Sequence, residues 1–66
     1  MNDNIKQISS KILETLQSDA SVTTAWQVKL RLKISSSILY MALGMLMAEG
    51  KIAVLQQGLD YKISLL

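Results

Sequence analysis

An uncharged stretch from Ser35 to Ala48 constrains the fold of this chain more than any other feature. Three serines open it, and serine hydroxyls at such positions satisfy the free backbone N–H groups of a helix start. Gly50 closes it, and glycine readily takes the left-handed conformation that ends a helix. We therefore predict a helix that begins within Ser35–Ser37, runs to Glu49 and stops at Gly50.

Two further helices are indicated before this stretch. Apolar residues at intervals of three and four predict the first helix over about residues 4–17: Ile5, Ile8, Ile12 and Leu16. Asn4 and Gln7 suggest a capping box at its start. Thr24 and Gln27 have the same spacing and predict a second helix over about residues 25–32.

The C-terminal part of the sequence has the pattern of a β-hairpin. We predict strands at Ile52–Leu55 and Tyr61–Leu65, joined by a loop over Gln56–Asp60 that contains Gly58. Ser21–Thr23 is long enough for a single β-bridge only. The expected fold class is mainly α with a small β-wing, a winged helix-turn-helix domain of three helices, a short strand and a C-terminal hairpin.

Length and composition limit the function classes. The chain has 66 residues, so we predict one domain over residues 1–66. It contains no Cys and no His, which excludes disulfides, thiolate and imidazole metal sites and the usual general base. The acidic residues are scattered, and the serines have no histidine beside them. We expect no enzyme activity, no metal, no cofactor and no small-molecule substrate.

The sequence also lacks the features of a membrane protein. No apolar run reaches the roughly 18 residues of a membrane span, and the polar start Met1–Asn4 is unlike a signal peptide. The expected location is the cytoplasm, with no membrane partner.

The segment from Leu39 to Ile52 resembles the recognition helix and the start of the wing in winged helix-turn-helix proteins. A closer likeness is to a family of short uncharacterised bacterial winged-helix proteins, and it rests on Ala42, Leu43, Gly44, Leu46, Glu49, Lys51 and Ile52. Met45 and Ala48 stand where that family tends to carry tryptophan and arginine. The resemblance implies an architecture of the DNA-binding type, while fold alone does not decide function.

The third helix is poorly equipped to read DNA. Direct readout of bases uses Arg, Lys, Asn and Gln, and Ser35–Ala48 contains none of them. Possible contacts to phosphates are Lys29, Arg31, Lys33 and Lys51, and the residues nearest the bases would be Ser36, Ser37 and Tyr40. These lysines can equally be ordinary solubilising residues. Any nucleic-acid binding is expected to be weak and indifferent to sequence.

The third helix instead predicts a protein interface. If Leu39, Ala42, Leu43 and Leu46 face the core, an uncharged set of residues lies opposite them or at the edges of that face: Ser37, Ile38, Met41, Gly44, Met45 and Ala48. Either the hairpin or the Trp26–Leu30 pair covers this face within the monomer, or a partner covers it. We predict a partner, namely a second copy in a homodimer or another protein. The main functional hypothesis is therefore macromolecular association, and the alternative is a weak dimeric DNA-binding regulator.

Overall fold

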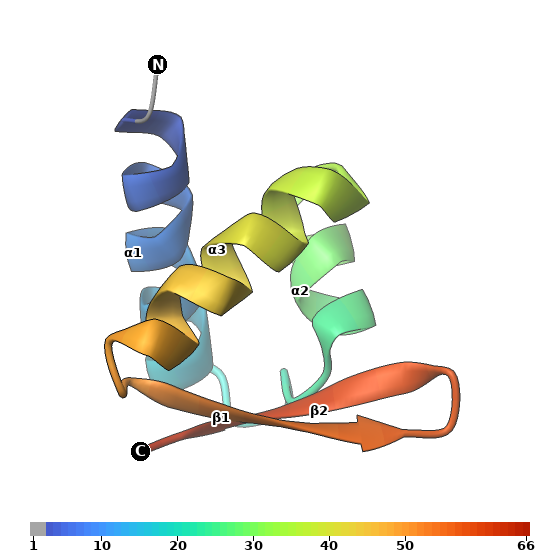
Figure 1. Ribbon diagram of the computed structural model, residues 1–66. Coiled ribbons are helices and arrows are strands. Elements are labelled where there is room, and N and C mark those ends of the chain that lie inside the picture. The colour runs from blue at the N-terminus through green and yellow to red at the C-terminus, as the bar shows by residue number, and fades with distance from the viewer. Residues whose placement is uncertain (1–2) are drawn as a thin grey trace.

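The computed structural model describes residues 3–66, and side-chain environments from Ile5 onward. Three helices are followed by two antiparallel strands (Figure 1). Their bounds are α1 Asp3–Ser18, α2 Ala25–Leu32, α3 Ser36–Ala48, β1 Ile52–Gln57 and β2 Asp60–Leu65. The predicted order of three helices and a C-terminal hairpin is confirmed.

The helix starts of α2 and α3 follow the predicted capping pattern. The Thr24 hydroxyl accepts a hydrogen bond from the Gln27 N–H, and the Gln27 side chain accepts one from the Thr24 N–H at 3.1 Å. Ser35 caps α3 by accepting from the Ile38 N–H at 3.3 Å. Lys33 ends α2 in the left-handed conformation, with φ of 55°. Local sequence signals thus determine both ends of α2 and the start of α3.

Two predicted helix ends are wrong by one residue. α1 begins at Asp3, so Asn4 lies inside the helix rather than at its cap, and the Asn4 side chain lies outside the described part of the chain. α3 ends at Ala48, with Glu49 as its C-cap, although Gly50 has the expected positive φ of 72°. Terminal turns fray, and side-chain patterns fix them less sharply than they fix the middle of a helix.

The hairpin is longer and its turn tighter than predicted. β1 and β2 pair in register from Ile52↔Leu65 to Gln57↔Asp60, so the turn consists of Gly58 and Leu59 alone. Gly58 has φ of 64°, as the first central residue of a type II′ turn requires. The predicted loop over residues 56–60 is wrong because Gln56 and Gln57 belong to β1. The hydrogen bonds between strands are made by the backbone, so exposed glutamines can take part in them as readily as apolar residues do.

A bridge connects the hairpin to the start of α2. Thr24 pairs with Lys62, and the Ile63 N–H donates to the Thr23 carbonyl at 2.7 Å. The predicted single bridge therefore exists, one residue later than Ser21–Thr23. The Asp60 carboxylate adds a second tie, because it accepts from the Trp26 N–H at 3.2 Å. β2 is thus held on the side that faces α2.

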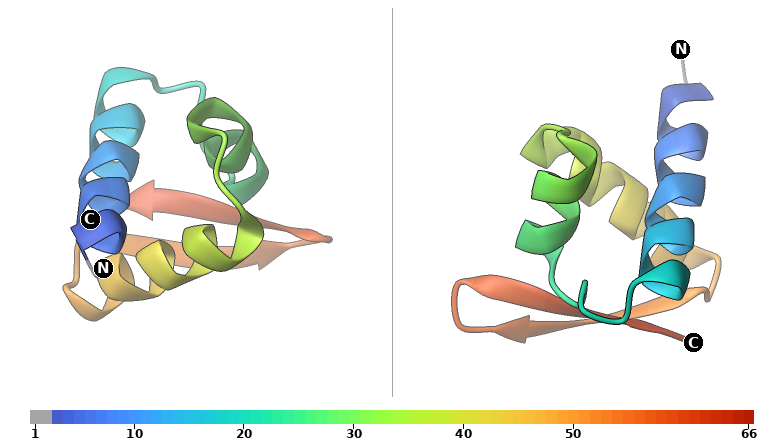
Figure 2. Two further views of the ribbon diagram at one scale, coloured as in Figure 1. Left: turned by 90° about the horizontal axis from the view of Figure 1, so that it is seen from above. Right: turned by 180° about the vertical axis from the view of Figure 1, so that it is seen from behind.

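The core lies where the three helices and the inner side of the hairpin meet. α1 packs against α3, α2 packs against β2, and α3 packs against β1 (Figure 2). The four α3 residues that were predicted to face the core are at most 2% exposed: Leu39, Ala42, Leu43 and Leu46. Ile12, Val28, Ile52 and Ile63 complete the buried centre.

Within residues 3–66, no single helix is long and apolar enough to cross a membrane. α2 and α3 together reach that length and composition, but the chain bends by 119° between them.

Candidate interaction surface

The side of α3 opposite the core is open to solvent. We call Ser37, Met41, Gly44 and Ala48 the outer face of α3. Met41 is 59% exposed, Ser37 and Ala48 are exposed, and Gly44 is half-buried. Because Ser37, Met41 and Ala48 are exposed, neither the hairpin nor the Trp26–Leu30 pair covers this face. No charged residue occurs on α3, so the face is an uncharged surface in contact with water.

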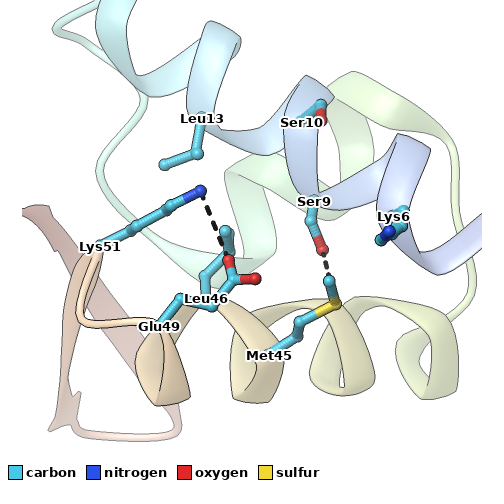
Figure 3. A pocket seen from close by; sticks show the side chains of 8 residues that line it. All are labelled: Lys6, Ser9, Ser10, Leu13, Met45, Leu46, Glu49 and Lys51. Atoms are coloured by element: carbon cyan, nitrogen blue, oxygen red, sulfur yellow. Dashed lines mark hydrogen bonds and ion pairs between the residues drawn. The ribbon is translucent and has the colours of Figure 1, made fainter.

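One edge of the expected interface is partly covered by α1. Met45 is half-buried, and the Ser9 hydroxyl donates a hydrogen bond to its sulfur at 3.7 Å. Figure 3 shows the Met45 side chain lying beside Ser9, in the groove between α1 and α3. Ile38 is half-buried as well. The assignment of Ile38 and Met45 to the edge of the interface stays a prediction, and the crossing of α1 over α3 that partly covers Met45 cannot be derived from the periodicity of either helix.

The other edge of α3 meets the hairpin and forms an apolar hollow of about 250 Å³. Its lining residues are Tyr40, Leu43, Met47, Val54 and Tyr61. The Tyr40 and Tyr61 rings are in edge-to-face contact, with centroids 5.9 Å apart. This apolar hollow was missed from the sequence, although the seven-residue spacing of Tyr40 and Met47 places both on one side of α3.

The candidate DNA contacts do not form one basic surface. Lys29 lies over the Trp26 ring, 5.5 Å from its centroid. Lys51 pairs with Glu49 at 3.5 Å in the α1–α3 groove (Figure 3), at the end of α3 that lies away from α2 (Figure 1). Ser36 and Ser37 are exposed in the first turn of α3, and Tyr40 contacts Tyr61. Lys33 is exposed.

Arg31 is paired with a carboxylate rather than open to a phosphate. Its guanidinium donates to Asp19, and both side chains are partly exposed. The Ser21 hydroxyl and the Ser21 N–H also donate to Asp19, at 2.6 and 3.0 Å. These hydrogen bonds from Ser21, followed by the contact with Arg31, lower the pKa of Asp19 below its ordinary value of 3.8. The same contacts tie the loop after α1 to the end of α2.

The described residues contain no group of three or more acidic side chains close enough to hold a metal ion. Asp60 lies beside Trp26 and Lys29 in a hollow at the tip of the hairpin, but its carboxylate already accepts from two backbone N–H groups, those of Trp26 and Tyr61. The surface features that stand out are therefore the outer face of α3 and the apolar hollow beside it.

Comparison of the chain with known protein families, with curated proteins and with solved structures finds no match. The family resemblance inferred from the sequence stays a prediction, and the functional argument rests on the surface itself.

Proposed function

We propose that this chain is a non-catalytic winged helix-turn-helix domain that acts by association, as a homodimer formed through the outer face of α3. The fold assignment is supported by the α2–α3 pair, which is joined by the three residues 33–35 and bends by 119°. Helix-turn-helix units have angles of about 90–120° and turns of this length. The hairpin after α3 takes the place of the wing.

The exposed and uncharged outer face of α3 is the observation that carries the functional proposal. Large contiguous apolar patches on a small protein often mark binding sites, and Met41 is the large apolar side chain that this face exposes. In a two-fold dimer each copy contributes the same patch, so charges of one sign near the axis would be brought together. α3 carries no charge, and a second copy can therefore dock here without electrostatic cost.

Gly44 supports close approach by a partner. Glycine in the middle of a helix costs about 0.5–1 kcal/mol relative to alanine. A Cβ built at Gly44 would meet no atom within 4 Å, apart from its own helical backbone. The packing of residues 3–66 thus gives no reason for a glycine, whereas a second helix crossing at Gly44 and Ala48 does.

The size of the surface predicts a weak dimer. A standard interface buries about 800 Å² on each partner, which is a little under a fifth of the 4488 Å² that the chain exposes. The outer face of α3 is only part of one short helix and falls below that area. We expect a dissociation constant of about 1 to 100 µM. Burial of the Met41 side chain should provide much of the binding free energy.

Charge placed on the outer face tests this proposal. Met41→Glu should give a folded monomer, because the dimer would bury two carboxylates close to each other. Leu30→Glu is the matched control, since Leu30 is 55% exposed but lies on α2. Analytical ultracentrifugation should show a dimer for Leu30→Glu and a monomer for Met41→Glu. Equal masses for the two variants would refute the assignment of the face.

The second candidate function is weak DNA binding by the dimer. The helix-turn-helix geometry favours it, and α2 carries Lys29 and no acidic residue, while Arg31 would have to leave Asp19 to contact a phosphate. Sequence-specific binding at physiological salt would promote this candidate over self-association. Binding that disappears between low and physiological salt would indicate phosphate contacts only.

A further inference from the structure

Beyond Ile52, which is buried, β1 has one edge with which no other strand of residues 3–66 pairs. β2 lies between β1 and the short Thr23–Thr24 segment, so the edge of β1 that faces away from β2 is the outer edge of the sheet. Within residues 3–66, no hydrogen bond joins the backbone of Ile52, Val54 or Gln56 to another element. An uncovered edge of this kind can accept a further strand.

The hairpin register shows which groups point outward. The Leu66 N–H donates to the Lys51 carbonyl at 3.1 Å, so Lys51 and Leu66 form a hydrogen-bonded pair of the antiparallel ladder. Hydrogen-bonded and non-hydrogen-bonded pairs alternate along an antiparallel ladder. The backbone groups of Ala53 and Leu55 therefore bond to β2 as well. The N–H and C=O groups of Ile52, Val54 and Gln56 therefore point away from β2, and of these three residues only Ile52 is buried.

This edge lacks the features by which proteins block strand addition. Charged residues, prolines and bulges usually protect an edge. Residues 52–57 contain no charged residue and no proline, and they pair one to one with β2 without a bulge. Leu55 on the outer side of the hairpin is 69% exposed. Ile52 is only 2% exposed, so the part of β1 that is available for pairing is residues 53–57.

The apolar hollow lies next to the same edge. The backbone of α3 packs against β1, and the Tyr40 ring also reaches Tyr61 on β2, so the hollow lies between this flank of α3 and the hairpin. Val54 belongs to both features: its backbone points outward, and its side chain lines the hollow. Peptide sites that work by strand addition combine these two parts, an edge for the backbone and a pocket for alternate side chains.

We propose that the groove between β1 and α3 binds an extended segment of a partner protein, which adds to β1 as a further antiparallel or parallel strand. The segment carries aliphatic side chains at alternate positions, and one of them enters the apolar hollow. It is uncharged where it passes Tyr40 and Met47, because the lining of the hollow carries no charge. This site is separate from the outer face of α3 and does not depend on dimer formation.

A second copy of β1 does not fit the groove. Two-fold pairing of β1 with itself would put both α3 helices on the same side of the joined sheet. Adjacent strands lie about 4.8 Å apart, whereas packed helices need about 8–10 Å between their axes. Because each α3 packs over β1 rather than over β2, the two helices would overlap. A single extended strand without its own helix avoids this clash.

Selection from a library of random ten-residue peptides displayed on phage tests the proposal. Wild-type protein should enrich peptides with alternating aliphatic residues. Gln56→Pro removes one outward N–H, and the Gln56 side chain is exposed, so this variant should bind the enriched peptides at least tenfold more weakly. Gln56→Ala keeps the N–H and should bind them normally. Circular dichroism verifies that both variants fold.

A change in the peptide makes the test independent of protein stability. N-methylation of alternate residues in the best peptide should abolish binding in one alternation phase and leave it intact in the other. The amide exchange of Val54 and Gln56 should slow at least tenfold when the peptide binds. Failure to enrich any peptide, helical 3–4 spacing in the enriched ones, or equal binding by Gln56→Pro would overturn the proposal. Met41→Glu should bind the peptide as the wild type does, which separates this site from the dimer interface.

Discussion

The Tyr40 ring on α3 meets the Tyr61 ring on β2 edge to face, with centroids 5.9 Å apart and planes at 81°. This contact links α3 to the far strand of the hairpin, although the backbone of α3 packs against β1. Aromatic pairs in this geometry contribute about 0.5–1.5 kcal/mol beyond the burial of area. A double-mutant cycle of Tyr40→Leu and Tyr61→Leu, measured by chemical denaturation, should show a coupling of this size. Simple additivity would mean that the contact does not hold the hairpin to α3.

Leu46 is a central core residue and gives the strongest prediction for stability. It is 1% exposed and packs within the cluster that includes Ile12 and Leu43. Leu46→Ala should lower the free energy of unfolding by about 2–5 kcal/mol, a large fraction of the total for so small a domain. Thermal melting followed by circular dichroism measures the loss. Met47→Ala, on the exposed side of the same helix, should cost much less.

Gly44 should show opposite effects on folding and on association. Gly44→Ala should stabilise the dilute monomer by about 0.5–1 kcal/mol, because alanine is the better helix former and the new Cβ meets nothing. The same methyl group should weaken the dimer. Gly58→Ala is the control: its φ of 64° makes alanine unfavourable, so it should destabilise the fold and leave association unchanged. Stabilisation of both monomer and dimer by Gly44→Ala would argue against helix contact at this point.

Asp19 should make stability depend on pH in the acid range. Its pKa is lowered in the folded chain below the ordinary value of 3.8 by Ser21 and Arg31. A carboxyl group with a lowered folded pKa stabilises the fold above its unfolded pKa, and this contribution is lost as the pH falls through the folded pKa. The melting temperature of the wild type should therefore fall more steeply below about pH 4 than that of Asp19→Asn. Parallel melting curves for the two proteins at all pH values would show that the Asp19 contacts do not contribute.

Local signals in the sequence determined much of the fold. Thr24 and Gln27 mark the start of α2 because a capping box is satisfied by the backbone within one turn. The buried side of α3 was identified from the periodicity of its apolar residues, because a helix packs its apolar stripe against the core. The residues of this stripe are Leu39, Ala42, Leu43 and Leu46. Features within a few residues of each other were therefore predictable.

Features that depend on how elements cross were not predictable in the same way. Met45 is covered by Ser9, which is 36 residues away in sequence, and no pattern in α3 indicates that α1 crosses there. The apolar hollow needs the hairpin register that brings Val54 near α3, and the glutamines at 56 and 57 resembled loop residues. The exposure of the Trp26–Leu30 pair also follows from packing rather than from local sequence. These positions depend on the tertiary arrangement.

The oligomeric state of the wild-type chain tests the central claim most directly. Sedimentation equilibrium should be measured from about 10 µM to about 1 mM, a range that covers the expected dissociation constant. The account predicts a mass that rises from the monomer value of 7.3 kDa towards twice that value. A mass that stays at the monomer value up to about 1 mM would contradict self-association through the outer face of α3.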